Sequence, residues 1–285
     1  MQPIQTIIVS SGLSQPSDDQ RHIIQQLHQL FLSLNVHYMA DASWQAFIDE
    51  PLTPHQHQPI EHGLLITVGG DGSFLRSHVL AHELNTPILG INAGNLGFLA
   101  DLSPTDAKAL LPPLLLGHYQ IEQRPLLTIQ HEHQTFLALN ECSLKYKSGQ
   151  HLLTCEVFID DQPVFLQRSD GIIVATPTGS TAYNMSAGGP IVHPQVPGII
   201  LTSICPHRLN SRPMIIPNTS TITLRARQPA TLSIDGQQDY TSHQEDIIIS
   251  TNHSSLRLVH PETYRYYQVI QQKLHWEVDA TPRSY

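Results

Sequence analysis

An apolar run that stops at a cluster of glycines constrains the fold of this chain more than any other feature. Residues 64–68 read Leu-Leu-Ile-Thr-Val, and Gly69-Gly70-Asp71-Gly72 follows at once. The run predicts a buried strand, and the glycines predict a tight turn. Apolar residues then recur over residues 74–80 at a spacing that keeps one helix face apolar. Strand, glycine turn and helix together form the arrangement at which α/β proteins bind phosphate.

Asp71 stands out among these glycines. Residues without Cβ let backbone N–H groups approach a polyanion, and the following helix start adds donors. A carboxylate would repel that polyanion unless Mg²⁺ lies between them or the carboxylate accepts a proton from an attacking hydroxyl. The simpler alternative is a glycine turn whose Asp71 only caps the helix. The chain has neither G-x-x-x-x-G-K-[ST] nor a complete G-x-G-x-x-G, because Leu75 stands at the third glycine position.

The first 124 residues show further α/β patterns. We expect a strand at residues 4–9, an amphipathic helix at 23–34, a strand at 87–92, and a helix at 104–116 interrupted by Pro112-Pro113. A second glycine-rich loop, residues 93–99, follows the strand at 87–92. Because ligands bind beyond the carboxyl ends of parallel strands, both glycine loops are expected to open onto one crevice.

From Leu126 the hydrophobic period changes from 3.6 to 2. This density of short strands with almost no helix predicts a β-sandwich. We therefore expect two domains: an α/β, Rossmann-like nucleotide-binding domain over residues 1–124 and an all-β sandwich over 125–265. A helix near Tyr266 is expected to pack back on the first domain, so that 266–285 returns to it. The sandwich strands are expected at residues 127–130, 136–139, 156–159, 172–175, 199–204, 221–224, 231–234, 247–249 and 256–259.

Charge and composition limit the possible partners. The chain of 285 residues has 15 Lys and Arg against 24 Asp and Glu, a formal net charge of −9. Such a surface repels nucleic acid and anionic membranes. No apolar run approaches the roughly 20 residues needed to span a bilayer, and the start lacks the pattern of a signal peptide, so we expect a cytoplasmic protein. Three widely spaced cysteines indicate neither a disulfide framework nor a thiolate zinc site.

Histidine is unusually frequent, with 18 residues. The tightest groups are His55-Gln56-His57 and His131-Glu132-His133, both in polar segments that resemble loops. Neither pair has a third candidate ligand nearby in a regular element, so we interpret them as solvated surface histidines rather than metal ligands.

Three stretches of the second half make poor strands and poor cores. They are Ser169-Asp170-Gly171, residues 176–184 (Thr-Pro-Thr-Gly-Ser-Thr-Ala-Tyr-Asn) and Gly188-Gly189-Pro190. Small residues and hydroxyls supply donors without bulk, which suits a sugar or a nucleotide edge. A long turn punctuated by proline and glycine explains them equally well on chemistry alone.

The combination of motifs resembles the NAD kinase family over residues 60–275. The motifs are Gly69-Gly70-Asp71-Gly72, Gly94-x-Leu96-Gly97-Phe98-Leu99, Asn140-Glu141, Asp170-Gly171, residues 176–183, Pro206-His207-x-Leu209 and Arg212-Pro213. The first is shared with phosphofructokinases and with lipid kinases, whereas the run at 176–183 is highly specific.

The resemblance implies ATP-dependent phosphorylation of the 2′-hydroxyl of the adenosine ribose of NAD, giving NADP and ADP. It also implies Mg²⁺ with ATP, or another divalent metal in its place, and a homodimer or homotetramer. Asp71 then looks like the general base. The resemblance implies phosphate or nucleotide contacts by Gly70, Gly72, Arg76 and Arg168, and NAD contacts by Asp71, Gly72, Phe98, Asn140, Glu141, Asp170, Thr181, Ala182, Tyr183, Ser186 and Gln237.

Some of these positions have simpler interpretations. Arg168 resembles the mark of family members that use ATP and not inorganic polyphosphate, but it also fits a surface charge. Gln237 lies in an Asp-Gly hairpin turn, and His207 fits a structural role better than a catalytic one. Two other functions remain open: a lipid kinase of the same structural group, and a catalytically silent NAD(P) sensor. The net charge disfavours the first, and a base beside a phosphate loop disfavours the second.

Overall fold

The computed structural model divides the chain into two compact units, Met1–Glu122 with Arg257–Tyr285, and Gln123–Leu256. It describes residues 1–11, 18–36, 38–40, 42–45, 47–48, 53–54, 58–94, 97–100, 102–147, 152–208, 210–251 and 254–276. Among the residues singled out above, Leu96, Leu209, His55 and His57 lie outside these ranges.

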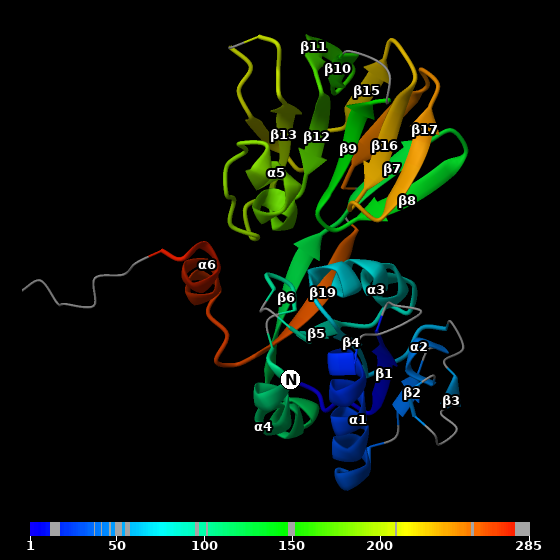
Figure 1. Ribbon diagram of the computed structural model, residues 1–285, viewed down its shortest axis with the longest axis vertical. Helices are drawn as coiled ribbons and strands as arrows, with labels where there is room; N and C mark the ends of the chain where they lie inside the picture. Colours follow the sequence, from blue (N-terminus) through cyan, green and yellow to red (C-terminus); the bar gives the residue numbers. More distant parts are fainter. Residues whose placement is uncertain are drawn as a thin grey trace, which may run out of the picture. The chain divides into compact units, whose positions relative to one another are not determined.

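The first unit is built on a seven-stranded sheet (Figure 1). In spatial order its strands are β3 (Thr53–Pro54), β2 (Tyr38–Ala40), β1 (Thr6–Ser10), β4 (Gly63–Val68), β5 (Ile88–Ile91), β19 (Ser255–Pro261) and β6 (Tyr119–Pro125). The pairs from β3 through β19 are parallel. The chain adds β2 and β3 on one side of β1 and then β4 and β5 on the other side. The carboxyl ends of β1 and β4 therefore lie at a topological switch point, where α/β sheets bind ligands.

Helices cover this sheet, as the periodic segments predict. They include α1 (Asp18–Ser33), α2 (Ala42–Gln45), α3 (Asp71–Glu83) and α4 (Pro104–Leu115). Buried side chains of α1 and α4 share one hydrophobic core with β1 and β4, among them Ile24, Phe31, Leu111 and Leu114. All six residues of β4 are buried, which agrees with the continuous apolar run that marks it in the sequence.

Three local expectations differ from the structure. Helix α3 begins at Asp71, so the aspartate lies in the first helical turn and not in the turn before it. Helix α4 continues through Pro112 and Pro113, which stand close enough to its end that the lost hydrogen bonds do not stop it. Residues 256–259 pair as β19 with β5 of the α/β sheet and not within the sandwich, because an alternating strand pattern does not specify which sheet it joins.

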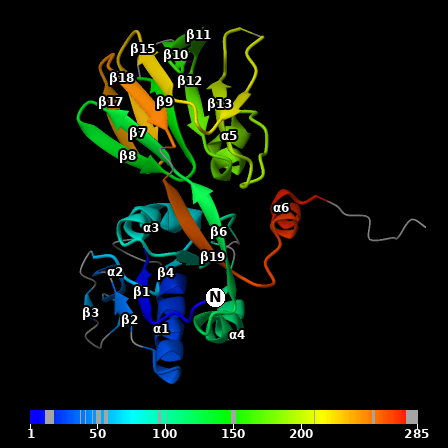
Figure 2. The ribbon, with the colours of Figure 1, turned by 180° about the vertical axis from the view of Figure 1, so that it is seen from behind.

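The second unit is a β-sandwich of two six-stranded antiparallel sheets (Figure 2). One sheet has the order β11 (Gln162–Ser169), β10 (Leu153–Ile159), β15 (Ile222–Ala226), β18 (Asp246–Ser250), β7 (Leu127–His131) and β8 (Gln134–Ala138). The other has the order β14 (Met214–Pro217), β13 (Gly198–Ile204), β12 (Gly171–Ala175), β9 (Glu141–Tyr146), β16 (Ala230–Ile234) and β17 (Gln238–Ser242). Alternate side chains of both sheets form one core between them, as expected for a sandwich.

Short helical segments and a final helix complete the fold. A 3₁₀ turn, η1 (Thr178–Thr181), and helix α5 (Tyr183–Ser186) follow β12. Helix α6 (Tyr266–Leu274) belongs to the first unit, where its residues Gln268 and Gln272 line a cavity together with Asp106 and Leu110 of α4. Within the described residues, no helix has the length and apolar character to cross a bilayer. Cys142, Cys155 and Cys205 are free thiols.

Candidate active site

The glycine turn after β4 places the start of α3 beside the end of β5. The backbone N–H of Gly69 donates to the carbonyl of Ile91 at 2.9 Å. Gly69 has φ +150°, and a Cβ there would lie 2.2 Å from Ser73 Oγ, so the position requires glycine. Gly70 is the N-cap of α3 and is exposed, and no side chain caps this helix. The helix start therefore keeps backbone donors available to an anion.

The carboxylate of Asp71 joins the two glycine loops. Its Oδ2 accepts a hydrogen bond from the backbone N–H of Phe98 at 2.9 Å. Its Oδ1 accepts from the N–H groups of Leu99 at 3.0 Å and Ala100 at 3.1 Å. Asp71 therefore does not act as a helix cap, the simpler interpretation of the motif. Its side chain instead fixes the second loop against the first, so the two loops lie together as expected.

Gly97 makes this contact possible. A Cβ on Gly97 would lie 1.9 Å from Asp71 Oδ1, well inside any allowed contact. Within the described residues, Oδ1 accepts two hydrogen bonds and Oδ2 accepts one. A carboxylate oxygen can accept about two, so Oδ2 retains a position for a further donor such as a sugar hydroxyl. Asp71 is partly exposed, which leaves that position accessible.

Two cationic side chains lie near these loops. Arg76 Nη2 donates to Ser73 Oγ at 3.3 Å, and Arg76 Nη1 lies 3.6 Å from the point that a Cβ on Gly72 would occupy. Burial lowers the pKa of Arg76. Lys273 of α6 has its Nζ 5.9 Å from the centroid of the Phe98 ring. Burial lowers the pKa of Lys273, and the Asp71 carboxylate opposes that shift. The sequence did not indicate Lys273 as a site residue, because the apolar spacing that predicts α6 does not show which of its polar side chains lies near Asp71.

In the second unit, Asp235 holds the segment that leads into β9. Its carboxylate accepts hydrogen bonds from the backbone N–H groups of Leu139 at 2.8 Å, Asn140 at 2.8 Å and Glu141 at 3.0 Å. On the other side of the segment, the carbonyl of Asn140 accepts from the N–H of Thr176 at 2.8 Å. The sequence marks Asp235 only as part of a hairpin turn. Its role depends on the fold, which brings this turn next to Asn140.

Glu141 lies almost entirely out of solvent, with 6 % of its surface exposed. Desolvation, and then the nearby Asp235 carboxylate, raise the pKa of Glu141 to about 8, while the backbone N–H of Tyr183 and the Lys145 ammonium oppose the shift. Glu141 Oε2 has no hydrogen-bond partner among the described residues. The raised pKa favours the protonated form of this side chain near neutral pH.

The run at residues 176–186 divides into a buried set and an exposed set. In the buried set, Thr176 Oγ1 donates to the carbonyl of Leu139 at 2.6 Å, and Ser180 Oγ donates to that of Val192 at 3.1 Å. Asn184 belongs to this set, since its Oδ1 accepts from Thr202 Oγ1 at 2.6 Å. The residues expected to contact NAD are the more exposed ones: Thr181, Ala182, Tyr183 and Ser186. The buried set thus fixes the loop whose other side chains face outward.

A cavity of about 450 Å³ brings several of these residues together. Asp170, Tyr183 and Lys145 line it, and Lys145 Nζ lies 5.9 Å from the centroid of the Tyr183 ring. Desolvation raises the pKa of Tyr183, helped by Cys205, Asp170 and Glu141. An aromatic face, a cation and a carboxylate around one hollow are suited to hold a heteroaromatic ring with polar edges.

Arg168 has cationic neighbours. It lines a second cavity, of about 460 Å³, together with Arg208 and Arg212. The backbone N–H of His207 donates to the carbonyl of Arg168 at 2.9 Å, which ties the Pro206-His207 segment to β11. That contact is structural, in line with the interpretation of His207. Gln237 is exposed in the hairpin turn, where its N–H donates to Ile234 O at 2.9 Å.

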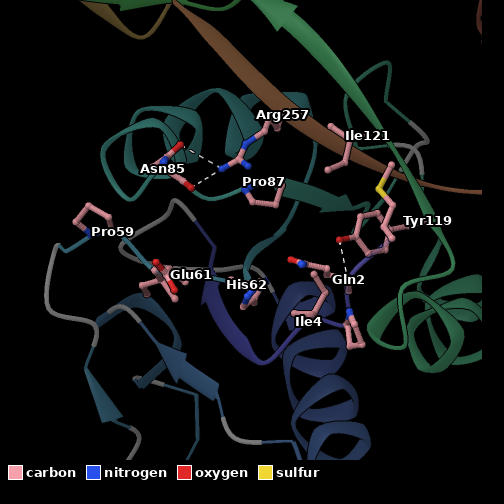
Figure 3. Close-up of a pocket in the computed structure, with 14 residues that line it drawn as sticks. Gln2, Ile4, Pro59, Glu61, His62, Asn85, Pro87, Tyr119, Ile121 and Arg257 are labelled. Atoms are coloured by element: carbon pink, nitrogen blue, oxygen red, sulfur yellow. Dashed lines mark hydrogen bonds between the residues drawn. The ribbon is translucent and has the colours of Figure 1, made fainter.

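Figure 3 shows a further cavity, of about 680 Å³, whose lining includes Gly63 and Pro87 at the amino ends of β4 and β5. There Tyr119 Oη donates to the carbonyl of Gln2 at 3.1 Å, and Arg257 donates to Asn85 Oδ1 at 3.2 Å. Its lining includes the residues that come just before β4 and just before β5 in the chain, so the cavity lies at the amino ends of these two strands. None of the expected site residues is among its lining residues.

These features define a phosphate-binding α/β unit joined to a β-sandwich unit that carries a candidate nucleotide pocket. Comparison with known proteins gives the family. Residues 25–119 match the ATP-NAD kinase N-terminal domain, and residues 139–260 match the ATP-NAD kinase C-terminal domain. The chain belongs to the NAD kinase family.

Individual relatives agree with this assignment. The chain is 38 % identical over 272 residues to an NAD kinase of Legionella pneumophila strain Paris. This match covers 90 % of this chain and 92 % of the Legionella protein. It is 36 % identical over 288 residues to an NAD kinase of Acidithiobacillus ferrooxidans, covering 96 % and 97 %. Among solved structures, yeast NADH kinase complexed with NADH matches with a TM-score of 0.78 at 26 % identity, covering 99 % and 90 %. An NAD kinase from Archaeoglobus fulgidus in complex with ATP matches with a TM-score of 0.75 at 25 % identity, covering 95 % and 98 %.

Proposed function

We propose that this protein is an ATP-dependent NAD kinase, which transfers the γ-phosphate of ATP to the 2′-hydroxyl of the adenosine ribose of NAD and releases NADP and ADP. The observation that carries this proposal is the Asp71 carboxylate, which three backbone N–H groups hold between two glycine loops with an acceptor position left on Oδ2. Membership of the family supports the choice of substrates.

Asp71 acts as the general base in this proposal. Its Oδ2 accepts the proton of the 2′-hydroxyl while that oxygen attacks the γ-phosphorus, and the bond from the γ-phosphorus to the oxygen of the leaving ADP breaks in line. A secondary hydroxyl is a weak nucleophile at neutral pH, so a positioned base contributes about 10²–10⁴ in rate. Because the loops already orient the carboxylate, little reorganisation is needed at the moment of reaction.

Mg²⁺, or another divalent ion in its place, enters as part of the ATP substrate. It supplies positive charge on the β- and γ-phosphate oxygens. The exposed Gly70 and the partly buried Gly72 supply N–H groups for the phosphates at the start of α3, and the exposed Arg76 supplies a guanidinium. Since Asp71 already accepts three hydrogen bonds, we assign it to the proton and not to the metal.

The second unit supplies the NAD contacts in this proposal. Tyr183 and Asp170 offer an aromatic face and a carboxylate around one cavity. The partly exposed Thr181 and Ala182 and the exposed Ser186 offer further small contacts from the same segment as Tyr183. We assign ribose contacts to Asn140 and Glu141 and an adenine contact to Phe98. Gln237 has the weakest support, because it is an exposed turn residue.

The same proposal includes a cytoplasmic homodimer or homotetramer. Its support is the apolar side chains Val164, Leu166 and Ile215, which are exposed on β11 and β14 at the edges of the two sandwich sheets. Exposed apolar edges of this kind are usually covered by another protein surface. Sedimentation of the purified protein measures the assembly directly, and a monomer at micromolar concentration contradicts this part.

The test is incubation with ATP, Mg²⁺ and NAD, with NADP measured by an NADP-specific dehydrogenase. We expect Asp71→Asn to fold and bind NAD while losing about 10²–10⁴ in turnover. Asp161→Asn, an equal charge change in an exposed turn, serves as the control. More than about one tenth of parental activity in Asp71→Asn contradicts the base assignment.

The two rival functions give different results in the same assay. A lipid kinase phosphorylates a sphingoid or diacylglycerol substrate and leaves NAD unchanged. A silent sensor binds NADP tightly without consuming ATP. The Asp71 carboxylate favours an enzyme over the sensor, because a sensor has no use for a base beside a phosphate loop.

A further inference from the structure

Three potential metal ligands meet on the β-sandwich unit, away in sequence from every residue assigned above. They are His131 at the end of β7, Glu132 in the turn that follows it, and Glu245 in the turn before β18. One ligand atom from each lies within 4.8 Å of the other two. The cluster was not visible in the sequence, where His131-Glu132-His133 has no third candidate ligand close by.

Strand pairing explains how the third ligand arrives. Strands β7 and β18 are antiparallel neighbours, and His131 pairs with Ile247 (Figure 2). Glu245 stands two residues before Ile247, so it lies on the same face of the sheet as the histidine. Glu132 and His133 form the two-residue turn between β7 and β8, because His131 pairs with Gln134. Two turns at one end of the sandwich thus bring their side chains together.

His131 is not the surface residue that its polar surroundings in the sequence indicate. Only 4 % of it is exposed, and its Nδ1 is buried without a hydrogen bond to any described residue. Within the described part of the chain it forms no ion pair with Glu132 or Glu245, although both lie nearby. A buried imidazole with an unpaired nitrogen is unfavourable unless something binds it. This is a second observation, independent of the two carboxylates, that indicates a ligand.

A backbone hydrogen bond orients the Glu245 side chain. Its Oε2 accepts a hydrogen bond of 2.6 Å from the backbone N–H of His243. Hydrogen bonds that orient a metal-binding carboxylate are a common part of metal sites.

We propose that His131, Glu132 and Glu245 form a zinc-binding site on the β-sandwich unit. An imidazole nitrogen and two carboxylate oxygens are ligands that Zn²⁺ accepts at about 2.0–2.2 Å, with water completing four-coordination. Tetrahedral bonds of that length place ligand atoms about 3.3–3.6 Å apart. The atoms lie within 4.8 Å of one another, so a small movement closes the site, and the exposed Glu132 side chain can make it.

The ion would join two turns of the sandwich and does not depend on the proposed kinase function. It would hold the β7–β8 turn to the turn that precedes β18. We therefore expect it to stabilise the unit and not to enter the phosphoryl transfer, which uses Mg²⁺ brought by ATP.

The test uses the full chain without a polyhistidine tag and Zn²⁺ as the probe. Affinity is measured at pH 7.5 by competition with a chromophoric chelator. We expect one site, and an affinity at least tenfold weaker in Glu132→Gln and in Glu245→Gln. Both changes are conservative and lie outside the core, so these variants are expected to fold.

Two histidine variants control for weak binding by the many other histidines. His133→Gln changes the exposed neighbour of Glu132 on the same turn, and His118→Gln changes an exposed histidine that lies 3.9 Å from Glu262. Both should keep the parental affinity within about twofold. If either weakens binding as much as the glutamate variants, or if the glutamate variants bind as the parent does, the proposed site is wrong.

Thermal unfolding gives a readout independent of the chelator. A fivefold molar excess of Zn²⁺ should raise the Tm of the parent and of His133→Gln, because a ligand that binds only the folded state stabilises it. It should leave the Tm of Glu132→Gln and Glu245→Gln unchanged. An equal rise in all four proteins contradicts the site.

Discussion

Asp235 Oδ1 accepts a hydrogen bond of 2.8 Å from the backbone N–H of Asn140, a residue 95 positions earlier in the chain. The same carboxylate accepts from Leu139 and Glu141, so it binds three successive amides. The β16–β17 turn therefore holds the start of β9, the segment whose side chains we assign to the ribose of NAD.

We expect Asp235→Asn to destabilise the protein and to weaken NAD binding. The amide that replaces the carboxylate has one acceptor oxygen for three buried donors, and each unsatisfied buried donor costs about 1–3 kcal/mol. Urea unfolding measures the loss, and the KM for NAD is expected to rise more than the KM for ATP. Asp239→Asn, on the exposed part of β17, is the control and should unfold as the parent does. Equal stability of the two variants contradicts the role of Asp235.

The buried Glu141 makes stability depend on pH. Its pKa is about 8 in the folded protein and near 4.5 when unfolded. Between these two pH values the folded state binds one more proton than the unfolded state. The free energy of unfolding therefore falls as pH rises, by up to about 1.4 kcal/mol per pH unit. Above about pH 8 this contribution is lost. The groups facing Glu141 are Asp235, Lys145 and the backbone of Tyr183.

Glu141→Gln removes this dependence. Between pH 6 and pH 8 the parent should lose about 2 kcal/mol more stability than the variant, from the slope given above. The measurement is urea unfolding at pH 6, 7 and 8. Glu61→Gln, at an exposed position, should keep the parental slope. Parallel pH profiles for the parent and Glu141→Gln mean that the carboxyl is already ionised at pH 6.

Gly97→Ala tests the position of the Asp71 carboxylate, the proposed general base, without changing it chemically. The new Cβ would lie 1.9 Å from Asp71 Oδ1, so the carboxylate or the loop has to move. We expect kcat to fall at least tenfold, since small displacements of a reacting group reduce rates strongly. Gly94→Ala is a matched control in the same loop, because its Cβ would meet nothing within 4 Å. Normal turnover in Gly97→Ala means that the observed Asp71 geometry is not the active one.

Arg168→Gln tests the cluster of three arginines. If Arg168, Arg208 and Arg212 bind the phosphates of ATP, the variant should raise the KM for ATP about tenfold, about 1.4 kcal/mol, and leave the KM for NAD unchanged. Initial rates at varied ATP and varied NAD separate the two constants. Arg227→Gln, an exposed arginine paired with Glu156, should change neither. A rise in the KM for NAD alone places Arg168 at the other substrate.

Much of the fold could be predicted from local patterns. The apolar run of β4, the spacing in α1 and the alternation in β7, β15 and β16 each reflect burial that is visible along the chain. Strand β9, Glu-Cys-Ser-Leu-Lys-Tyr, was not predicted although it shows the same alternation, and the burial of its polar residues Glu141 and Ser143 is not visible along the chain. Its polar side chains are accommodated by neighbours from distant parts of the chain.

The candidate site residues likewise divide into those that the sequence indicates and those that it does not. Asp71 is marked by its glycines, since a residue that needs close backbone approach is conspicuous in a sequence. Asp235, Lys273 and Glu245 are not marked, because each acts on a group far from it in the chain. The boundary at residue 257 was missed for a related reason: β19 has an ordinary strand pattern, and only its parallel pairing with β5 assigns it to the α/β sheet.

The division of residues 176–186 into inward and outward side chains has a consequence for how such a protein can change. Thr176, Ser180 and Asn184 carry the hydrogen bonds that shape the loop, whereas Thr181, Tyr183 and Ser186 take little part in that framework. If the outward positions contact NAD as proposed, their variation can change how the dinucleotide binds while the loop keeps its conformation. A library randomised at those three positions should yield mostly folded proteins, and one randomised at the inward three should not.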